Sequence, residues 1–69
     1  MKSSNYITIN SEIMGGRPVF LGTRVPIDGL FEYIEDGLTI DKFIADFPSV
    51  TKVLAVNVLE DVRLEIART

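Results

Sequence analysis

The sequence contains neither cysteine nor histidine, and these two absences exclude several kinds of function. Without cysteine, the chain can form no disulfide and no thiolate metal site. Without histidine, it lacks the commonest general base and the commonest metal ligand. The sequence also shows no phosphate-binding Walker motif and no zinc-binding pattern. We therefore expect no metal and no other cofactor, and an enzyme is the least favoured class of function.

Long apolar runs are also missing. No stretch approaches the ~18 consecutive apolar residues of a transmembrane helix. Residues 1–5 are polar and expected to fray, and no apolar signal region follows them. With 69 residues, the chain is expected to form a single cytoplasmic domain, residues 1–69, whose stability depends on a good core or on oligomerisation. Neither a membrane nor a small-molecule substrate is among the expected partners.

Positive charge is scarce and unevenly distributed. The formal net charge is −3, which argues against strong nonspecific binding of nucleic acid. Residues 1–27 carry three basic side chains and one acidic side chain, a net +2. Residues 28–69 carry four basic and nine acidic side chains, a net −5. If the protein contacts phosphate groups, its N-terminal part is the better source of positive charge.

Glycine and proline concentrate in residues 14–27, which hold three of the five glycines and two of the three prolines. Two interpretations of this segment are equally favoured. In the first, its glycines and prolines only shape a turn; in the second, the segment also binds another molecule through Arg17 and Arg24. On either side of the first glycines, residues 6–10 alternate like a half-buried strand and residues 19–21 form a short apolar run. The sequence leaves open whether these strands pair with each other or with a second chain.

The remainder of the chain has the apolar periodicity of helices. We expect helices at residues 27–36 and 40–47, and a third that follows Pro48 and runs to about residue 67. Gly37 suits the end of the first helix, Thr39 caps the second, and Ser49 or Thr51 caps the third. The predicted fold class is therefore mainly α: three helices in helix–turn–helix order, preceded by one or two short strands.

The third helix carries more apolar residues than one core-facing stripe needs. Its core stripe is expected to consist of Ala55, Val58, Leu59, Val62 and Ile66. Four further apolar residues lie outside this stripe: Val53, Leu54, Val56 and Leu64. Surplus apolar surface on so small a protein is usually covered by another molecule. These four residues are therefore the predicted interface with a partner or with a second copy in a homodimer.

The helix–turn–helix order suggests DNA binding, because the first residues of the last helix of such a unit meet the major groove. Thr51 and Lys52 occupy that position and are candidate DNA contacts, but only Lys52 is basic. No asparagine or glutamine accompanies them to read adenine. Clustered carboxylates elsewhere could hold Mg²⁺, but they are more simply the solvated faces of amphipathic helices, so we predict no catalytic residue and no metal site.

Two segments are distinctive as a pair: Gly15-Gly16-Arg17-Pro18-Val19 and Gly22-Thr23-Arg24-Val25-Pro26. With the helix ending at Gly37, Thr39-Ile40, Phe47-Pro48 and the long last helix, they resemble the bacterial domain-of-unknown-function family 433 over roughly residues 6–67. The resemblance implies a homeodomain-like three-helix fold. It also implies a VapB-type antitoxin that neutralises a PIN-like nuclease toxin and helps to repress its own operon. Arg17, Thr23 and Arg24 are the motif residues proposed to contact DNA.

Two functions therefore remain open. The first is an antitoxin-like adaptor of a toxin–antitoxin module, which binds a PIN-like toxin and contacts operator DNA. The second is a non-catalytic, dimeric protein-interaction module with no DNA role, which the acidic composition favours. Arg17 and Arg24 could point at DNA, at acidic groups of a toxin, or at the chain's own Asp28, Glu32 and Glu35.

Overall fold

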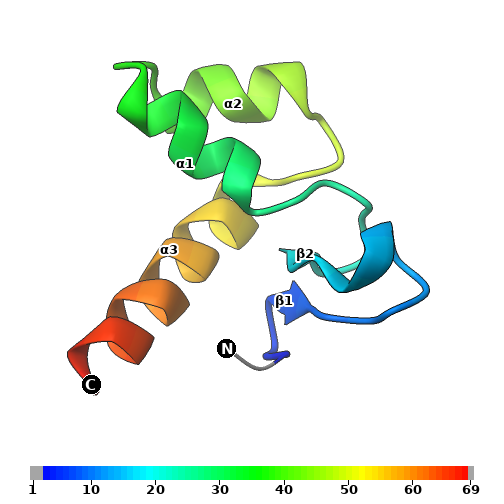
Figure 1. Cartoon of the computed structure of the whole chain (residues 1–69). Coiled ribbons are helices and arrows are strands. Elements are labelled where there is room, and N and C mark those ends of the chain that lie inside the picture. The colour runs from blue at the N-terminus through cyan, green and yellow to red at the C-terminus, as the bar shows by residue number, and fades with distance from the viewer. Residues whose placement is uncertain (1–2, 69) are drawn as a thin grey trace.

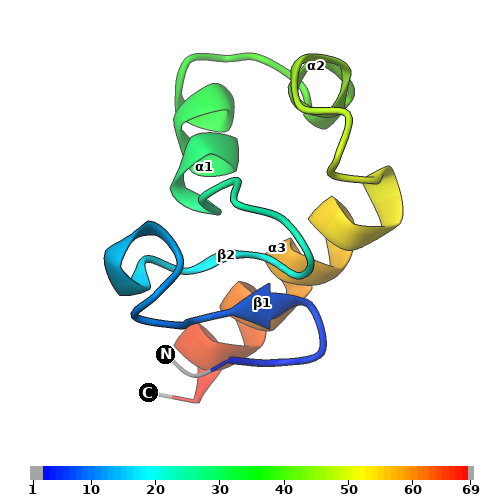
Figure 2. The same cartoon turned by 90° about the vertical axis from the view of Figure 1, so that its right-hand side faces the viewer.

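The computed structural model describes residues 3–68, which form one short antiparallel ribbon and three α-helices. In chain order the elements are β1 (Ile7–Thr8), a 3₁₀ turn η1 (Met14–Gly16), β2 (Val19–Phe20), α1 (Asp28–Glu35), α2 (Ile40–Asp46) and α3 (Lys52–Ala67). The predicted mainly helical fold, with short strands before three helices, is confirmed. α1 and α2 lie at one end of the molecule, and α3 leads away from them (Figure 1). The ribbon lies along one side of α3 (Figure 2).

The ribbon joins two segments of the same chain. Ile7 lies opposite Phe20 and Thr8 opposite Val19 in the antiparallel pair. The pairing that the sequence left open is therefore formed within the chain. Val19 also forms a bridge with Pro26, so the segment that follows β2 turns back along it. Since a two-stranded ribbon is marginal alone, its stability depends on packing against the helices.

β1 is shorter than the predicted strand, because the N-terminus folds back over its outer edge. The Ser3 hydroxyl accepts a hydrogen bond from the Ile9 N–H (2.8 Å). The Ser4 N–H donates to the Ile7 carbonyl (2.8 Å), and the Ser4 hydroxyl accepts from the Ile7 N–H (3.2 Å). These bonds occupy backbone groups that an edge strand would otherwise leave unpaired. The polar N-terminus, predicted to fray, instead caps the ribbon from Ser3 onward; residues 1–2 lie outside the described part.

Short-range signals set the helix ends as predicted. The Thr39 hydroxyl accepts from the Lys42 N–H (3.0 Å) at the start of α2. Thr51, not Ser49, caps α3, because its hydroxyl accepts from the Leu54 N–H (3.1 Å). α1 ends at Glu35, and two residues later Gly37 turns the chain with a φ of 80°, which is accessible to glycine without strain. Each cap satisfies a backbone group that the helix itself leaves unpaired.

Phe43 of α2 lies at the centre of the core. Its ring is fully buried and lies 5.7 Å from the ring of Phe20 on β2 and 5.1 Å from that of Tyr33 on α1. Gly29 on α1 faces the same ring: a Cβ there would lie 3.4 Å from the Phe43 Cε1 atom. That distance is an ordinary van der Waals contact, so α1 packs closely on the ring at this position. The buried cluster around it comprises Ile7, Phe20, Ile27, Leu30, Phe43, Val50, Ala55 and Val58.

The core-facing stripe of α3 is shorter than its apolar pattern predicted. Ala55 and Val58 are fully buried, and Leu59 and Val62 are partly buried against the core. Ile66 was predicted to join them but is 69% exposed, so that prediction is wrong. The reason is geometric: the last turns of α3 extend beyond the elements that could cover this side of the helix (Figure 1).

The central position of Phe43 leads to a stability prediction. We expect Phe43→Ala to lower the free energy of unfolding by about 3–5 kcal/mol, because it removes a fully buried ring and leaves a cavity. Phe47→Ala is the control, since the Phe47 ring centroid lies 4.9 Å from that of Phe43 but the residue is 36% exposed. This variant should lower the free energy of unfolding clearly less than Phe43→Ala does. Urea unfolding followed by circular dichroism measures both. Equal losses would contradict a core centred on Phe43.

Candidate functional site

The turn after β2, residues 21–25, is held by its own threonine; we call it the basic turn. The Thr23 hydroxyl donates to the Phe20 carbonyl (2.8 Å) and accepts from the Val25 N–H (3.0 Å). A backbone bond from the Phe20 N–H to the Val25 carbonyl (3.0 Å) closes the turn. Thr23, a predicted DNA contact, therefore uses its hydroxyl within the turn. The side chains that the turn exposes are Leu21 and Arg24.

The two motif arginines have different surroundings. Arg17 forms an ion pair with Asp28 at the start of α1 (3.3 Å), one of the intramolecular partners considered from the sequence. Both side chains are more than half exposed, so the pair is worth only about 0–1 kcal/mol and can exchange for another partner. Arg24 is exposed and has no hydrogen bond or ion pair within residues 3–68. Of the two, Arg24 is the one available to a ligand.

The start of α3 is also engaged within the chain. The Thr51 hydroxyl caps the helix, and Lys52 forms an ion pair with Asp41 of α2 (3.1 Å). The Asn57 side chain donates to the Val53 carbonyl within the helix (2.9 Å). The helix–turn–helix position therefore presents few free polar groups with which to read base edges.

Apolar side chains dominate the uncovered side of α3. Val53 is 70%, Val56 46% and Leu64 45% exposed, and the helical spacing places them on one side, here called the outer face. Leu54 differs from these three, since it is partly buried against the core. An ion pair between Glu60 and Arg63 crosses the outer face, and the Arg63 guanidinium lowers the pKa of the Glu60 carboxyl.

A cleft of about 410 Å³ lies between the folded-back N-terminus and the last turns of α3. It is lined by Ser3, Ser4, Asp61, Leu64, Glu65 and Arg68. The Ser4 hydroxyl donates to Asp61 Oδ2 (2.6 Å) and so ties the N-terminus to α3. Sequence reasoning missed this feature because it treated the first five residues as frayed, and no local pattern links Ser4 to a residue so distant in sequence.

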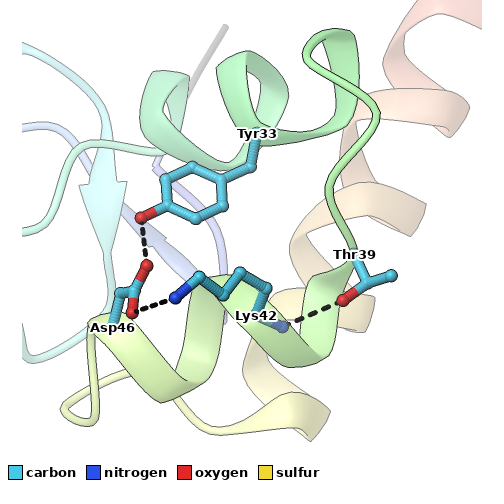
Figure 3. Close-up of polar contacts among 4 residues, drawn as sticks. All are labelled: Tyr33, Thr39, Lys42 and Asp46. Atoms are coloured by element: carbon cyan, nitrogen blue, oxygen red, sulfur yellow. Dashed lines mark hydrogen bonds and ion pairs between the residues drawn. The ribbon is translucent and has the colours of Figure 1, made fainter.

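A polar network on the opposite side of the molecule joins α1 to α2 (Figure 3). The Tyr33 hydroxyl donates to Asp46 Oδ2 (2.6 Å), and Lys42 Nζ lies 3.1 Å from Asp46 Oδ1. The hydrogen bond to Asp46 raises the pKa of Tyr33. The bonds from Tyr33 and Lys42 lower the pKa of Asp46. At neutral pH this arrangement favours a neutral tyrosine and an ionised aspartate, which suits a structural link between helices.

Within residues 3–68, no three carboxylates converge in a way that could hold a metal ion. None of the helices in the same range has the length and apolar character needed to cross a bilayer. The surfaces described above that could contact other molecules are the basic turn, the outer face of α3 and the cleft beside it.

The fold and these surfaces define a small helical domain with helix–turn–helix order, a basic turn and an apolar helix face. The family model described as "Protein of unknown function (DUF433)" matches residues 7–60. Because this match spans well over half of the chain, the protein belongs to the DUF433 family. Comparisons with curated proteins and with solved structures found no match.

The Tyr33–Asp46 bond leads to a pH prediction. Because the pKa of Asp46 is lowered by folding, its contribution to stability is present above the unfolded value of about 4 and is lost as the pH falls through the folded value. We expect the stability advantage of the parent over Asp46→Asn to shrink between about pH 5 and pH 2. Urea unfolding across this range measures it.

Asp36→Asn is the matched control, because the Asp36 carboxylate is exposed and has no bond or ion pair within residues 3–68. This variant breaks no side-chain bond or ion pair within residues 3–68, so its stability difference from the parent should change less over the same pH range than that of Asp46→Asn. A constant difference for Asp46→Asn would contradict the prediction.

Proposed function

We propose that this protein is an antitoxin-like binding protein of a toxin–antitoxin module, which neutralises a PIN-like nuclease toxin in the cytoplasm without being an enzyme itself. The observation that carries the proposal is the outer face of α3. Val53, Val56 and Leu64 leave apolar surface in water on the side of the helix opposite the core. Covering such surface by a partner is favourable by roughly 25 cal/mol per Å² before the costs of association.

The class of partner is suggested by two further observations. The paired motifs around Arg17 and Arg24 resemble those of the DUF433 family, to which the chain belongs, and that resemblance implies a VapB-type antitoxin. Residues 28–69 carry a net charge of −5, which would attract a basic protein and speed its association. An acidic antitoxin with an apolar helix face suits a cationic nuclease.

Operator DNA binding rests on fewer residues. Arg24 is the motif arginine without an intramolecular partner in residues 3–68, and Lys52 would have to leave Asp41 to bind a phosphate. One observation favours the alternative function, a dimeric protein-interaction module with no DNA role. The first exposed positions of α3 after Lys52 are Val53 and Val56, which suit a protein surface better than base edges.

If the protein is an antitoxin, affinity purification of the chain should recover a nuclease bound to it. The tagged chain, purified from nuclease-treated lysate of its native host, should bring down a small protein in near-stoichiometric amount. The RNA-cleaving activity of that protein should fall when the chain is added. We expect Val56→Lys to lower capture at least about tenfold, because it places a charge in the apolar interface.

Leu38→Lys is the matched control, since Leu38 is 44% exposed compared with 46% for Val56 but lies outside α3. It should leave capture unchanged. Recovery of the chain alone, or of a protein whose RNA cleavage the chain does not inhibit, would overturn the antitoxin function.

The DNA role has its own test. If the complex binds an operator fragment through Arg24 and Lys52, changing both to Ala should weaken binding and reduce the salt slope by about one unit per lost phosphate contact. A mobility-shift assay at several salt concentrations measures both effects. Lys42→Ala is the control, because Lys42 pairs with Asp46 within α2, away from the basic turn and from the outer face of α3. A salt slope equal to that of the parent would favour the module without a DNA role.

A further inference from the structure

The basic turn presents a preformed pair of side chains. Leu21 is 49% exposed and Arg24 is exposed, and the bonds of Thr23 fix the backbone between them. Little backbone entropy is lost when a turn already fixed in this way binds another molecule. The turn therefore displays one apolar and one cationic side chain in a fixed arrangement.

The cleft beside α3 has the opposite charge. Asp61 and Glu65 lie one turn apart on one wall, and neither forms an ion pair within residues 3–68. Arg68 at the end of the helix offsets one of the two charges, so one negative charge remains. The C-terminal end of a helix adds a partial negative charge. Leu64 lies between the two carboxylates in sequence and supplies apolar surface to the same cleft.

These two features are separated within one chain. The turn that follows β2 lies apart from the C-terminal end of α3 in both views (Figures 1 and 2). The hydrogen bonds and ion pairs of residues 3–68 include none between Arg24 and the cleft. A leucine and an unpaired arginine thus complement, in both polarity and charge, a cleft on another part of the same surface.

We infer that a second copy of this chain docks at the cleft, with Leu21 and Arg24 of each protomer entering the cleft of its partner. The guanidinium group would lie between the Asp61 and Glu65 carboxylates, where its planar fork can donate to both. Leu21 would contact Leu64. A two-fold axis makes this contact twice and closes the assembly as a dimer.

This dimer goes beyond the proposed function and does not depend on a nuclease partner. Val53 and Val56, at the other end of the outer face, stay uncovered in it. One helix would then hold a second copy through its last turns and a partner through its first turns. The contact is exposed and charged, so its strength should fall as salt is added.

A charge-swap experiment tests the contact on the purified chain. Sedimentation equilibrium from the low to the high micromolar range gives the dimer dissociation constant of the parent. We expect Arg24→Glu and Glu65→Arg each to raise it at least about tenfold through like-charge repulsion. The double variant, which exchanges the two charges, should bring it back close to the parent value, because the pair is restored in reverse.

Glu35→Arg is the matched control, since it makes the same charge change on α1, away from the cleft. It should leave the dissociation constant unchanged. A parent chain that stays monomeric throughout the range would overturn the inference, and so would a double variant no better than the single ones. If Glu35→Arg raised the dissociation constant and Glu65→Arg did not, the contact would involve α1 and the inference would also be overturned. Each variant changes an exposed side chain, and circular dichroism verifies that it folds.

Discussion

The packing of Phe43 against Phe20 and Tyr33 is the interaction on which the rest of the structure depends. It brings β2, α1 and α2 together around one ring. A chain of 69 residues without cysteine can form no disulfide and has few other ways to fix its ribbon to its helices. Gly29 lies against the same ring, where an added Cβ would be at ordinary van der Waals distance from the Phe43 Cε1 atom. With the ribbon fixed in this way, the basic turn that extends from β2 is held at a defined place on the surface.

The parts of the fold that could be predicted from the sequence are those that local chemistry decides. The cap at Thr39 and the glycine at the end of α1 are encoded within a few residues of where they act. The bond between Ser4 and Asp61 could not be predicted, because it joins residues 57 positions apart without any periodic pattern. Ile66 shows a related difficulty. Its spacing suits the core stripe, but whether anything covers it depends on how far α3 extends beyond the ribbon.

The candidate site shows why counting charges along the sequence was only partly informative. The net +2 of residues 1–27 indicated a cationic surface, but Arg17 is partly neutralised by Asp28 across the turn into α1. Lys52 is paired in the same way with Asp41. Such pairs form between residues that folding brings together, so their effect is visible only in the structure. The surplus apolar residues of α3 were a better guide, because Val53, Val56 and Leu64 are exposed, although Leu54 is partly buried.

The outer face and the cleft share one helix, and this has a consequence for how partners would influence each other. α3 is anchored to the core through Ala55 and Val58, near its first turns, whereas its last turns are held by the Ser4 contact to Asp61. A molecule in the cleft would add contacts to the less covered end of the helix. Val53 and Val56 lie on the turns that the core already anchors, so ordering of the last turns changes little for a ligand bound there, and we expect the two surfaces to bind their ligands nearly independently.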